Sequence, residues 1–235
     1  MSYTCISCDN KSEKLYHKYK GGIIKITVCD KCGKVVDKYI EYDLVIVSLD
    51  ALLLKRQAFR HILINRRLKS HWKILLVLLI CEAITKLLDD TDIDDNKLWK
   101  SGDVIYSALE IDLYWNFIFA GLEMFSLISG VLLCIYIFRL FLPQTEFQSF
   151  TNIIHGLVLS CLGKILILPA ILWGLKTSTL YVQLCMLFTV AANVQALRVL
   201  LPDWNTIVIM ICIVCGHTLA NLTSVGLQTI KTVLI

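Results

Sequence analysis

The sequence has few charged residues and few prolines. Charged residues make up 18% of its 235 positions and only three positions are proline, whereas 57% are hydrophobic and the mean hydropathy is +0.68. An ordinary soluble domain is only about 45–50% apolar. The chain therefore has more apolar side chain than its own core could bury, which excludes a single soluble globular domain.

Catalytic and nucleotide-binding motifs are also missing. No nucleophile–base set, glycine-rich phosphate loop or pair of catalytic carboxylates stands out in the sequence. The stretch Asp92-x-Asp94-Asp95 lacks the glycine and the glutamate of a calcium-binding loop, so we interpret it as a solvated acidic loop. We therefore expect the protein not to be an enzyme.

The strongest motif present is a pair of cysteine pairs near the N-terminus. Cys5-x2-Cys8 and Cys29-x2-Cys32 are separated by twenty residues, which is typical of a zinc ribbon. Each pair offers two thiolates to one ion, and two pairs complete a tetrahedral shell at roughly 2.3 Å. Because four protein ligands leave no open coordination position, we predict that Zn²⁺ at this site is structural.

The segment between the cysteine pairs predicts a β-hairpin. Residues 15–20 and 23–28 are rich in strand-forming residues and are joined at Gly21-Gly22, while Gly33 follows the second pair where positive φ is common. Disulfides and a redox motif are the alternatives. No signal peptide precedes Cys5, and the βαβ context of a thioredoxin-type motif is lacking.

Charge is distributed unevenly and predicts an orientation. Residues 1–73 contain 15 basic and seven acidic residues, residues 89–112 contain two basic and eight acidic ones, and charges are scarce beyond Leu113. Short basic flanks stay in the cytosol. We therefore expect a cytosolic N-terminal region and a lumenal 89–112 loop, which agrees with thiolates that stay reduced in the cytosol. The acceptor sequence Asn10-Lys11-Ser12 should then carry no glycan.

The apolar runs predict a polytopic helical membrane region over residues 71–235. We expect about five spans, and four if the first is re-entrant. Their approximate bounds are 72–88, 113–142, 153–173, 180–200 and 207–226.

An amphipathic helix is predicted over residues 44–70, between the ribbon region 1–43 and the first span. Its apolar residues recur along one stripe, with basic residues beside it, as in helices that lie on anionic membranes. A helix packed on the ribbon or on the bundle is the alternative. The candidate membrane-surface residues are Lys55, Arg56, Arg60, Arg66 and Arg67.

Polar residues inside the spans are candidate functional positions, because ionisable groups near the bilayer centre are costly. They are Glu82, Glu123, Lys164, Asn193 and Gln195, with His217 placed near the lumenal end of the last span. Glu123 and Lys164 lie at similar depth, about 15 Å from opposite faces, so we predict that they pair. These groups either hold helices together or anchor a lipid headgroup or a sterol hydroxyl.

Several strings around the cysteines resemble the homology domain of the Arv family. The strings are Cys5-Ile6-Ser7-Cys8, Thr27-Val28-Cys29, Val36-Asp37-Lys38-Tyr39-Ile40-Glu41-Tyr42-Asp43 and Phe59-Arg60-His61-Ile62-Leu63-Ile64-Asn65. The resemblance covers residues 3–65 densely and continues in patches through Gly163-Lys164 and Asn193-x-Gln195-Ala196. It implies that residues 1–70 together form the homology domain of that family, with Cys5, Cys8, Cys29 and Cys32 as metal ligands.

The resemblance also implies a function. Members of the family are endoplasmic-reticulum membrane proteins of sterol homeostasis, with links to sphingolipids and to glycosylphosphatidylinositol-anchor synthesis. We therefore expect a mediator of sterol transport between membranes whose partners are membrane lipids, with sterol first among them, and no nucleic acid. The alternative is a zinc-ribbon scaffold that is anchored in the membrane and recruits lipid-metabolic enzymes without carrying lipid itself.

The fold class that follows is mainly α-helical. It consists of a helical membrane bundle with about five spans, a small β zinc ribbon at the N-terminus and an interfacial amphipathic helix between them.

Overall fold

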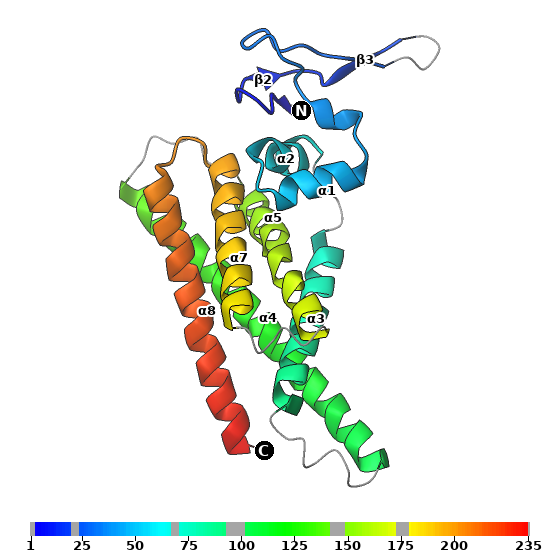
Figure 1. Ribbon diagram of the computed structural model, residues 1–235. Coiled ribbons are helices and arrows are strands. Elements are labelled where there is room, and N and C mark those ends of the chain that lie inside the picture. The colour runs from blue at the N-terminus through cyan, green and yellow to red at the C-terminus, as the bar shows by residue number, and fades with distance from the viewer. Residues whose placement is uncertain are drawn as a thin grey trace.

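The protein consists of a small N-terminal domain above a bundle of long helices (Figure 1). The computed structural model describes residues 3–19, 24–66, 71–92, 102–141, 149–172 and 179–234. We call residues 3–66 the head. The turn predicted at Gly21-Gly22, and Arg67 among the predicted membrane-surface residues, lie outside the described residues.

The head begins with two short antiparallel pairs of strands. β1 (Tyr3–Thr4) pairs with β2 (Lys11–Ser12), and β3 (Tyr16–Lys18) pairs with β4 (Ile24–Ile26). The second pair is the predicted hairpin, with Tyr16 opposite Ile26. Gly33 has φ of +68°, which confirms the predicted positive φ, and it donates its N–H to the Cys29 carbonyl oxygen at 2.9 Å.

Short helices complete the head, and they correct the predicted single helix over residues 44–70. The helices are η1 (Lys38–Ile40), α1 (Leu44–Leu52), α2 (Arg56–Arg60) and the π-helical turn η2 (His61–Asn65). The chain breaks at Leu54, whose φ of +56° is incompatible with a continuing right-handed helix. After this break the Lys55 N–H returns to the Asp50 carbonyl oxygen at 3.0 Å, so α2 and η2 fold back under the ribbon.

The remaining helices form the bundle. They are α3 (His71–Asp92), α4 (Gly102–Phe141), α5 (Phe150–Ser160), η3 (Cys161–Leu166), α6 (Ile167–Leu172), α7 (Thr179–Leu200) and α8 (Thr206–Leu234). Four stretches are long and apolar enough to cross a membrane: Glu110–Phe141, Phe150–Pro169, Leu180–Leu200 and Thr206–Lys231. They correspond to the last four of the five predicted spans.

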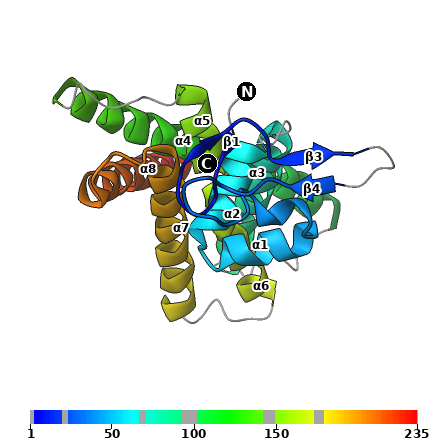
Figure 2. The same ribbon diagram turned by 90° about the horizontal axis from the view of Figure 1, so that it is seen from above.

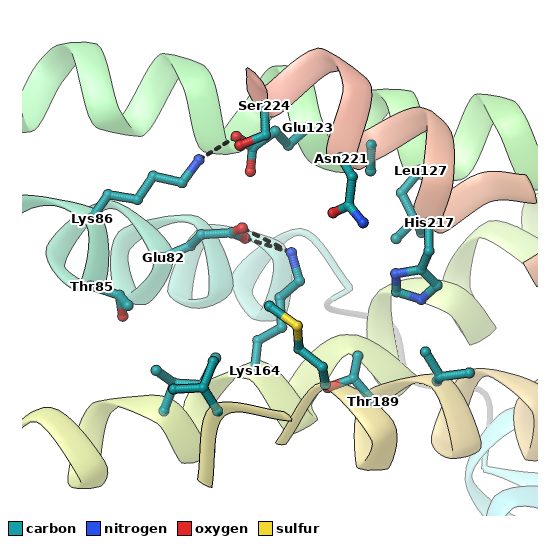
Figure 3. Close-up of a pocket in the computed structure, with 15 residues that line it drawn as sticks. Glu82, Thr85, Lys86, Glu123, Leu127, Lys164, Thr189, His217, Asn221 and Ser224 are labelled. Atoms are coloured by element: carbon teal, nitrogen blue, oxygen red, sulfur yellow. Dashed lines mark hydrogen bonds and ion pairs between the residues drawn. The ribbon is translucent and has the colours of Figure 1, made fainter. Parts of the chain in front are cut away.

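The first predicted span is a helix, α3, but it is not among those four. Its 22 residues would measure about 33 Å, which is long enough to cross. Its charged residues Lys73, Glu82 and Lys86 set it apart from those four, and the Glu82 and Lys86 side chains are directed into the bundle (Figure 3). Its exposed side chains include Trp72, Val77 and Ile80, so the outer face of α3 is apolar.

The third predicted span is interrupted rather than continuous. Between α5 and α6 the chain forms six residues of 3₁₀-helix, Cys161–Leu166, and this segment carries Lys164. Gly163 allows close packing there, because an added Cβ would lie 2.8 Å from Phe188 and from the Thr189 hydroxyl on α7.

The main core lies where α4, α5, α7 and α8 meet, around Leu157, Leu197 and Ile213. Helices α4 and α8 approach closely because Gly130 faces Gly216, as small residues permit in membrane bundles. A Cβ added to Gly130 would lie 3.1 Å from the Gly216 Cα atom, and one added to Gly216 would lie 3.0 Å from the Leu127 carbonyl oxygen. This contact fixes the relative position of the two longest helices.

Candidate metal centre and bundle cavities

The four predicted cysteines converge on one point in the head. All four Sγ atoms lie within 4.8 Å of one another, with Cys5 and Cys32 at 3.8 Å and Cys8 and Cys29 at 3.5 Å. A disulfide would bring two sulfurs to about 2.05 Å. Sulfurs around a tetrahedral ion at 2.3 Å would be about 3.8 Å apart. The cluster can therefore hold a metal ion, and its spacing fits Zn²⁺.

Backbone hydrogen bonds shape this cluster. The Cys5 N–H donates to the Asn10 carbonyl oxygen at 2.9 Å, and the Cys29 N–H donates to the Lys34 carbonyl oxygen at 2.8 Å. Hydrogen bonds from the backbone of Cys32 and then Lys31 outweigh desolvation and lower the pKa of Cys29 to about 6. The thiolate, which is the form that binds a metal ion, is therefore favoured at Cys29.

A buried carboxylate joins the ribbon to the helices below it. Asp37 is fully buried and accepts hydrogen bonds from the Tyr39 N–H at 3.0 Å and from Asn65 Nδ2 at 2.7 Å. His61 Nδ1 lies 2.8 Å from Asp37 Oδ2, the same oxygen that accepts from Asn65. The Asn65 side chain also accepts from the Thr4 N–H and donates to the Thr4 carbonyl oxygen, both at 3.0 Å. Sequence spacing did not reveal this network, although its members stand within the strings that carry the family resemblance.

A second link ties α1 to η1. The Tyr39 hydroxyl donates to Asp50 at 2.8 Å and Lys55 Nζ lies 2.6 Å from the same carboxylate. The hydrogen bond from Lys55 and then that from Tyr39 lower the pKa of Asp50. The Asp50 carboxylate therefore stays charged at neutral pH. Burial of the Tyr39 hydroxyl, and then its hydrogen bond to Asp50, raise the pKa of Tyr39.

The predicted membrane-surface residues have different roles in the structure. Arg60 is buried: it donates to the Ile6 carbonyl oxygen at 3.0 Å and to the Asp9 carboxylate, so it holds the ribbon onto α2 instead of facing lipid. Arg56 donates to the Arg198 carbonyl oxygen on α7 at 3.3 Å, and Lys55 pairs with Asp50. Among the described members of the set, only the exposed Arg66 is left to contact a membrane surface.

The exposed face of the head helices is apolar rather than basic. On α1 and just after it, several large side chains are exposed: Leu44, Val45, Ile46, Leu49, Leu52 and Leu53. Contiguous exposed apolar side chains are typical of surfaces that contact a membrane or a partner. This surface therefore consists of exposed hydrophobic side chains and not of the predicted basic stripe.

Four charged residues of the bundle and His217 line one cavity of about 390 Å³ (Figure 3). The predicted pairing of Glu123 with Lys164 is wrong. Lys164 Nζ lies 2.8 and 3.0 Å from the two oxygens of Glu82, and Glu123 pairs with Lys86 at 2.5 Å. Expected depth alone suggested that Glu123 and Lys164 pair, but the order of the helices around the cavity decided the partners. Lys86 is a member that sequence reasoning missed.

The other predicted polar residues divide between two places. Asn193 is fully buried and lies 3.0 Å from His217 Nε2, and it accepts from the Ser160 hydroxyl. Because α8 continues to Leu234, His217 lies near the middle of that helix and not near its end. Gln195 lies outside this cluster and donates to the Leu54 carbonyl oxygen at 3.1 Å, which ties α7 to the break in the head.

A second cavity of about 400 Å³ lies between the head and the bundle. Its walls come from α1, α2 and η2 on one side and from α3, α5, η3 and α7 on the other. Most lining residues are apolar, and Arg66 is the only charged side chain among the described ones. The hydroxyl-bearing residues Ser48 and Ser160 also line it.

Comparison with known proteins gives a consistent match. The model of the Arv1-like family matches residues 4–197. Protein ARV1 of Homo sapiens is 37% identical over 201 residues, which is 85% of this chain and 72% of the relative. Protein ARV1 of Mus musculus is 36% identical over 201 residues, covering 85% and 74%. Protein ARV1 of Candida albicans is 55% identical over 62 residues, covering 26% and 21%. No solved structure matches the chain.

Proposed function

Because the chain belongs to the Arv1-like family, we propose that it mediates sterol homeostasis at the endoplasmic reticulum. In this proposal it takes part in moving sterol between membranes, with consequent effects on sphingolipid metabolism. Sterol is held in the cavity between head and bundle, and Zn²⁺ in the cysteine cluster keeps the head folded. The metal has a structural role because its four thiolates leave no position for a substrate.

The observation that carries the proposal is the composition of that cavity. A sterol presents a large rigid apolar surface and one hydroxyl. The cavity of about 400 Å³ offers apolar walls from Phe59, Leu162 and Phe188, with few polar groups. Mostly apolar cavities of about 300–1,000 Å³ with a small number of polar groups are the usual form of small-molecule sites. Arg66 and Ser48 are placed to meet a hydroxyl.

Filling this cavity is expected to remove sterol binding. Ser48 lines the cavity from the exposed side of α1, so Ser48→Phe inserts a ring there without replacing a core residue. Overpacking a site costs about 1–3 kcal/mol, which corresponds to roughly a 5- to 150-fold loss of affinity. The measurement is labelling of the nanodisc-embedded protein by a photoreactive sterol, competed by unlabelled sterol.

Val45→Phe is the matched control, because Val45 is exposed on the same helix but does not line the cavity. It should label like the parent protein. Unsaturable labelling of the parent, or equal labelling of both variants, would place any sterol contact outside this cavity.

The proposed orientation puts the head in the cytosol, with α3 as a fifth membrane-spanning helix. The basic excess of residues 1–73 supports the cytosolic side. The apolar outer face of α3, with Glu82 and Lys86 turned inward, supports crossing. Five crossings then bring the C-terminal end of α8 to the lumen.

Two glycosylation reporters test this topology in microsomes. Asn10-Lys11-Ser12 should remain unmodified, and an acceptor tag added after Ile235 should be fully glycosylated. The same tag with glutamine in place of its asparagine is the control. An unmodified tag would mean that α3 does not cross, and a glycan on Asn10 would reverse the orientation.

A scaffold is the second candidate function. In it, the head recruits enzymes of lipid or glycosylphosphatidylinositol-anchor synthesis, and the bundle is only an anchor. The ribbon favours this alternative because the hairpin β3–β4 projects away from the bundle (Figures 1 and 2) and exposes Tyr16 and Ile24. Sterol labelling of the parent that no cavity variant alters would favour the scaffold.

A further inference from the structure

The charged cavity of the bundle opens sideways between α7 and α8. These helices are packed together near their connected ends, around Leu201 and Ile209, and the view from above shows α7 diverging from α8 beyond that point (Figure 2). Met186 on α7 and Asn221 on α8 both line the cavity and are both exposed. In a membrane this opening faces lipid. A molecule could therefore place a polar end inside while its apolar chains stay in the bilayer.

The floor of the cavity carries balanced charge from three elements. Glu82 and Lys86 lie one turn apart on α3, Glu123 comes from α4, and Lys164 comes from the 3₁₀ segment η3. Charged groups at this depth are costly and mark functional sites by default. These four groups form two ion pairs with each other, Lys164 with Glu82 and Lys86 with Glu123. A sterol hydroxyl or a simple anion that entered between them could not replace the partners of both signs. A ligand that carries one positive and one negative group matches both signs.

The other residues that line the cavity indicate which kind of positive group the ligand carries. Among the described residues, the Asn221 amide and the Ser224 hydroxyl make no side-chain hydrogen bond, and both belong to the cavity wall (Figure 3). None of the described lining residues is Phe, Tyr or Trp. Quaternary ammonium groups are recognised by aromatic cages, whereas a primary ammonium donates hydrogen bonds to carboxylates. The lining therefore fits a primary amine.

We propose that this cavity binds the phosphoethanolamine headgroup of a membrane phospholipid. The phosphate lies between Lys86 and Lys164, the ammonium group lies against Glu82 and Glu123, and the acyl chains leave through the opening between α7 and α8. Asn221 and Ser224 supply further hydrogen bonds to the phosphate oxygens. The inference goes beyond the sterol proposal, because it uses another cavity and another class of lipid.

Competition on the parent protein is the first test. The full chain in nanodiscs is cross-linked to phosphatidylethanolamine that carries a photoreactive acyl chain, and the labelled peptides are mapped. Unlabelled phosphatidylethanolamine should compete at least about tenfold better than phosphatidylcholine, as expected for one lost charge-assisted hydrogen bond. Labels should map to α7 and α8. Soluble glycerophosphoethanolamine distinguishes a membrane phospholipid from a free headgroup compound as the ligand. If it competed as strongly as the lipid, the headgroup alone would be recognised, contrary to the proposal.

A double substitution tests the charged floor without leaving a charge unpaired. Glu82→Met with Lys164→Met replaces one ion pair by apolar groups, which is often neutral for stability. We expect saturable labelling to fall at least about tenfold with no change in thermal transition or metal content. The matched control is Asp112→Met with Lys231→Met, an α4–α8 pair at 3.6 Å of which neither member lines this cavity, and it should label like the parent.

A single neutral substitution tests specificity. Glu123→Gln leaves the cavity with one excess positive charge, so phosphatidic acid should now compete better than phosphatidylethanolamine. A purely structural role for the ion pairs would not change lipid preference. Equal competition by the ethanolamine and choline lipids on the parent protein, or an unchanged preference in a folded Glu123→Gln variant, would overturn the proposal even if the double variant fails to fold.

Discussion

Cys29→Ser is expected to abolish zinc binding and to unfold the head. Its sulfur is one of four within 4.8 Å, and a tetrahedral site with one ligand lost binds metal far more weakly. Structural zinc contributes about 10–16 kcal/mol in small metal-dependent domains, comparable to or larger than the roughly 5–15 kcal/mol that keeps a domain folded. Purified parent protein should contain one zinc per chain by elemental analysis, and the variant none.

Limited proteolysis measures whether the head unfolds in the variant. Residues 3–66 should resist cleavage in the parent and become accessible in Cys29→Ser or after prolonged chelation. Cys215→Ser is the matched control, because Cys215 is an exposed cysteine of α8 outside the cluster. A variant at Cys29 that retained one zinc per chain and a protected head would refute the assignment of the metal ligands.

Asp37→Ala is expected to destabilise the head by about 3–5 kcal/mol, because it removes the buried acceptor shared by Tyr39, His61 and Asn65. At roughly 1.4 kcal/mol for each factor of ten, native-state cleavage of the head should become at least about 100-fold faster. The exposed Asp43 precedes α1 without a side-chain capping bond, so Asp43→Ala should change the free energy of unfolding by less than about 0.5 kcal/mol.

A double-mutant cycle shows whether the network acts as a unit. Asp37→Ala with His61→Ala should cost less than the sum of the two single variants, because each single change already leaves the other partner without its hydrogen bond. Additive costs would mean that the two side chains contribute independently and that the 2.8 Å contact has little energetic weight.

The predictions from local spacing were those that the structure supports best. Four cysteines in two Cys-x2-Cys pairs come together, and β3 and β4 form the hairpin between them. The last four apolar runs coincide with helical stretches that are long and apolar enough to cross a membrane. Each of these features depends on residues close in sequence, on turn chemistry or on average hydropathy, and all three can be read from the sequence without the tertiary structure.

The predictions that failed depended on directions in space. Arg60 was placed on a membrane surface, yet the break at Leu54 turns α2 so that this residue meets Ile6 and Asp9 in the ribbon. An expectation based on one continuous helix could not include that turn. The chain reversal at Leu54 therefore decided what Lys55, Arg56 and Arg60 contact.

The sequence by itself determined the four cysteines that converge in the head and the apolar helical stretches of the bundle. Only the tertiary structure decided that Lys164 meets Glu82 and that Lys86 meets Glu123. Hydropathy reports position along a helix axis, whereas partners depend on the rotation of each helix and on which helices are neighbours. The close Gly130–Gly216 contact and the 3₁₀ segment around Lys164 belong to that second kind of information, which comes from packing among distant parts of the chain.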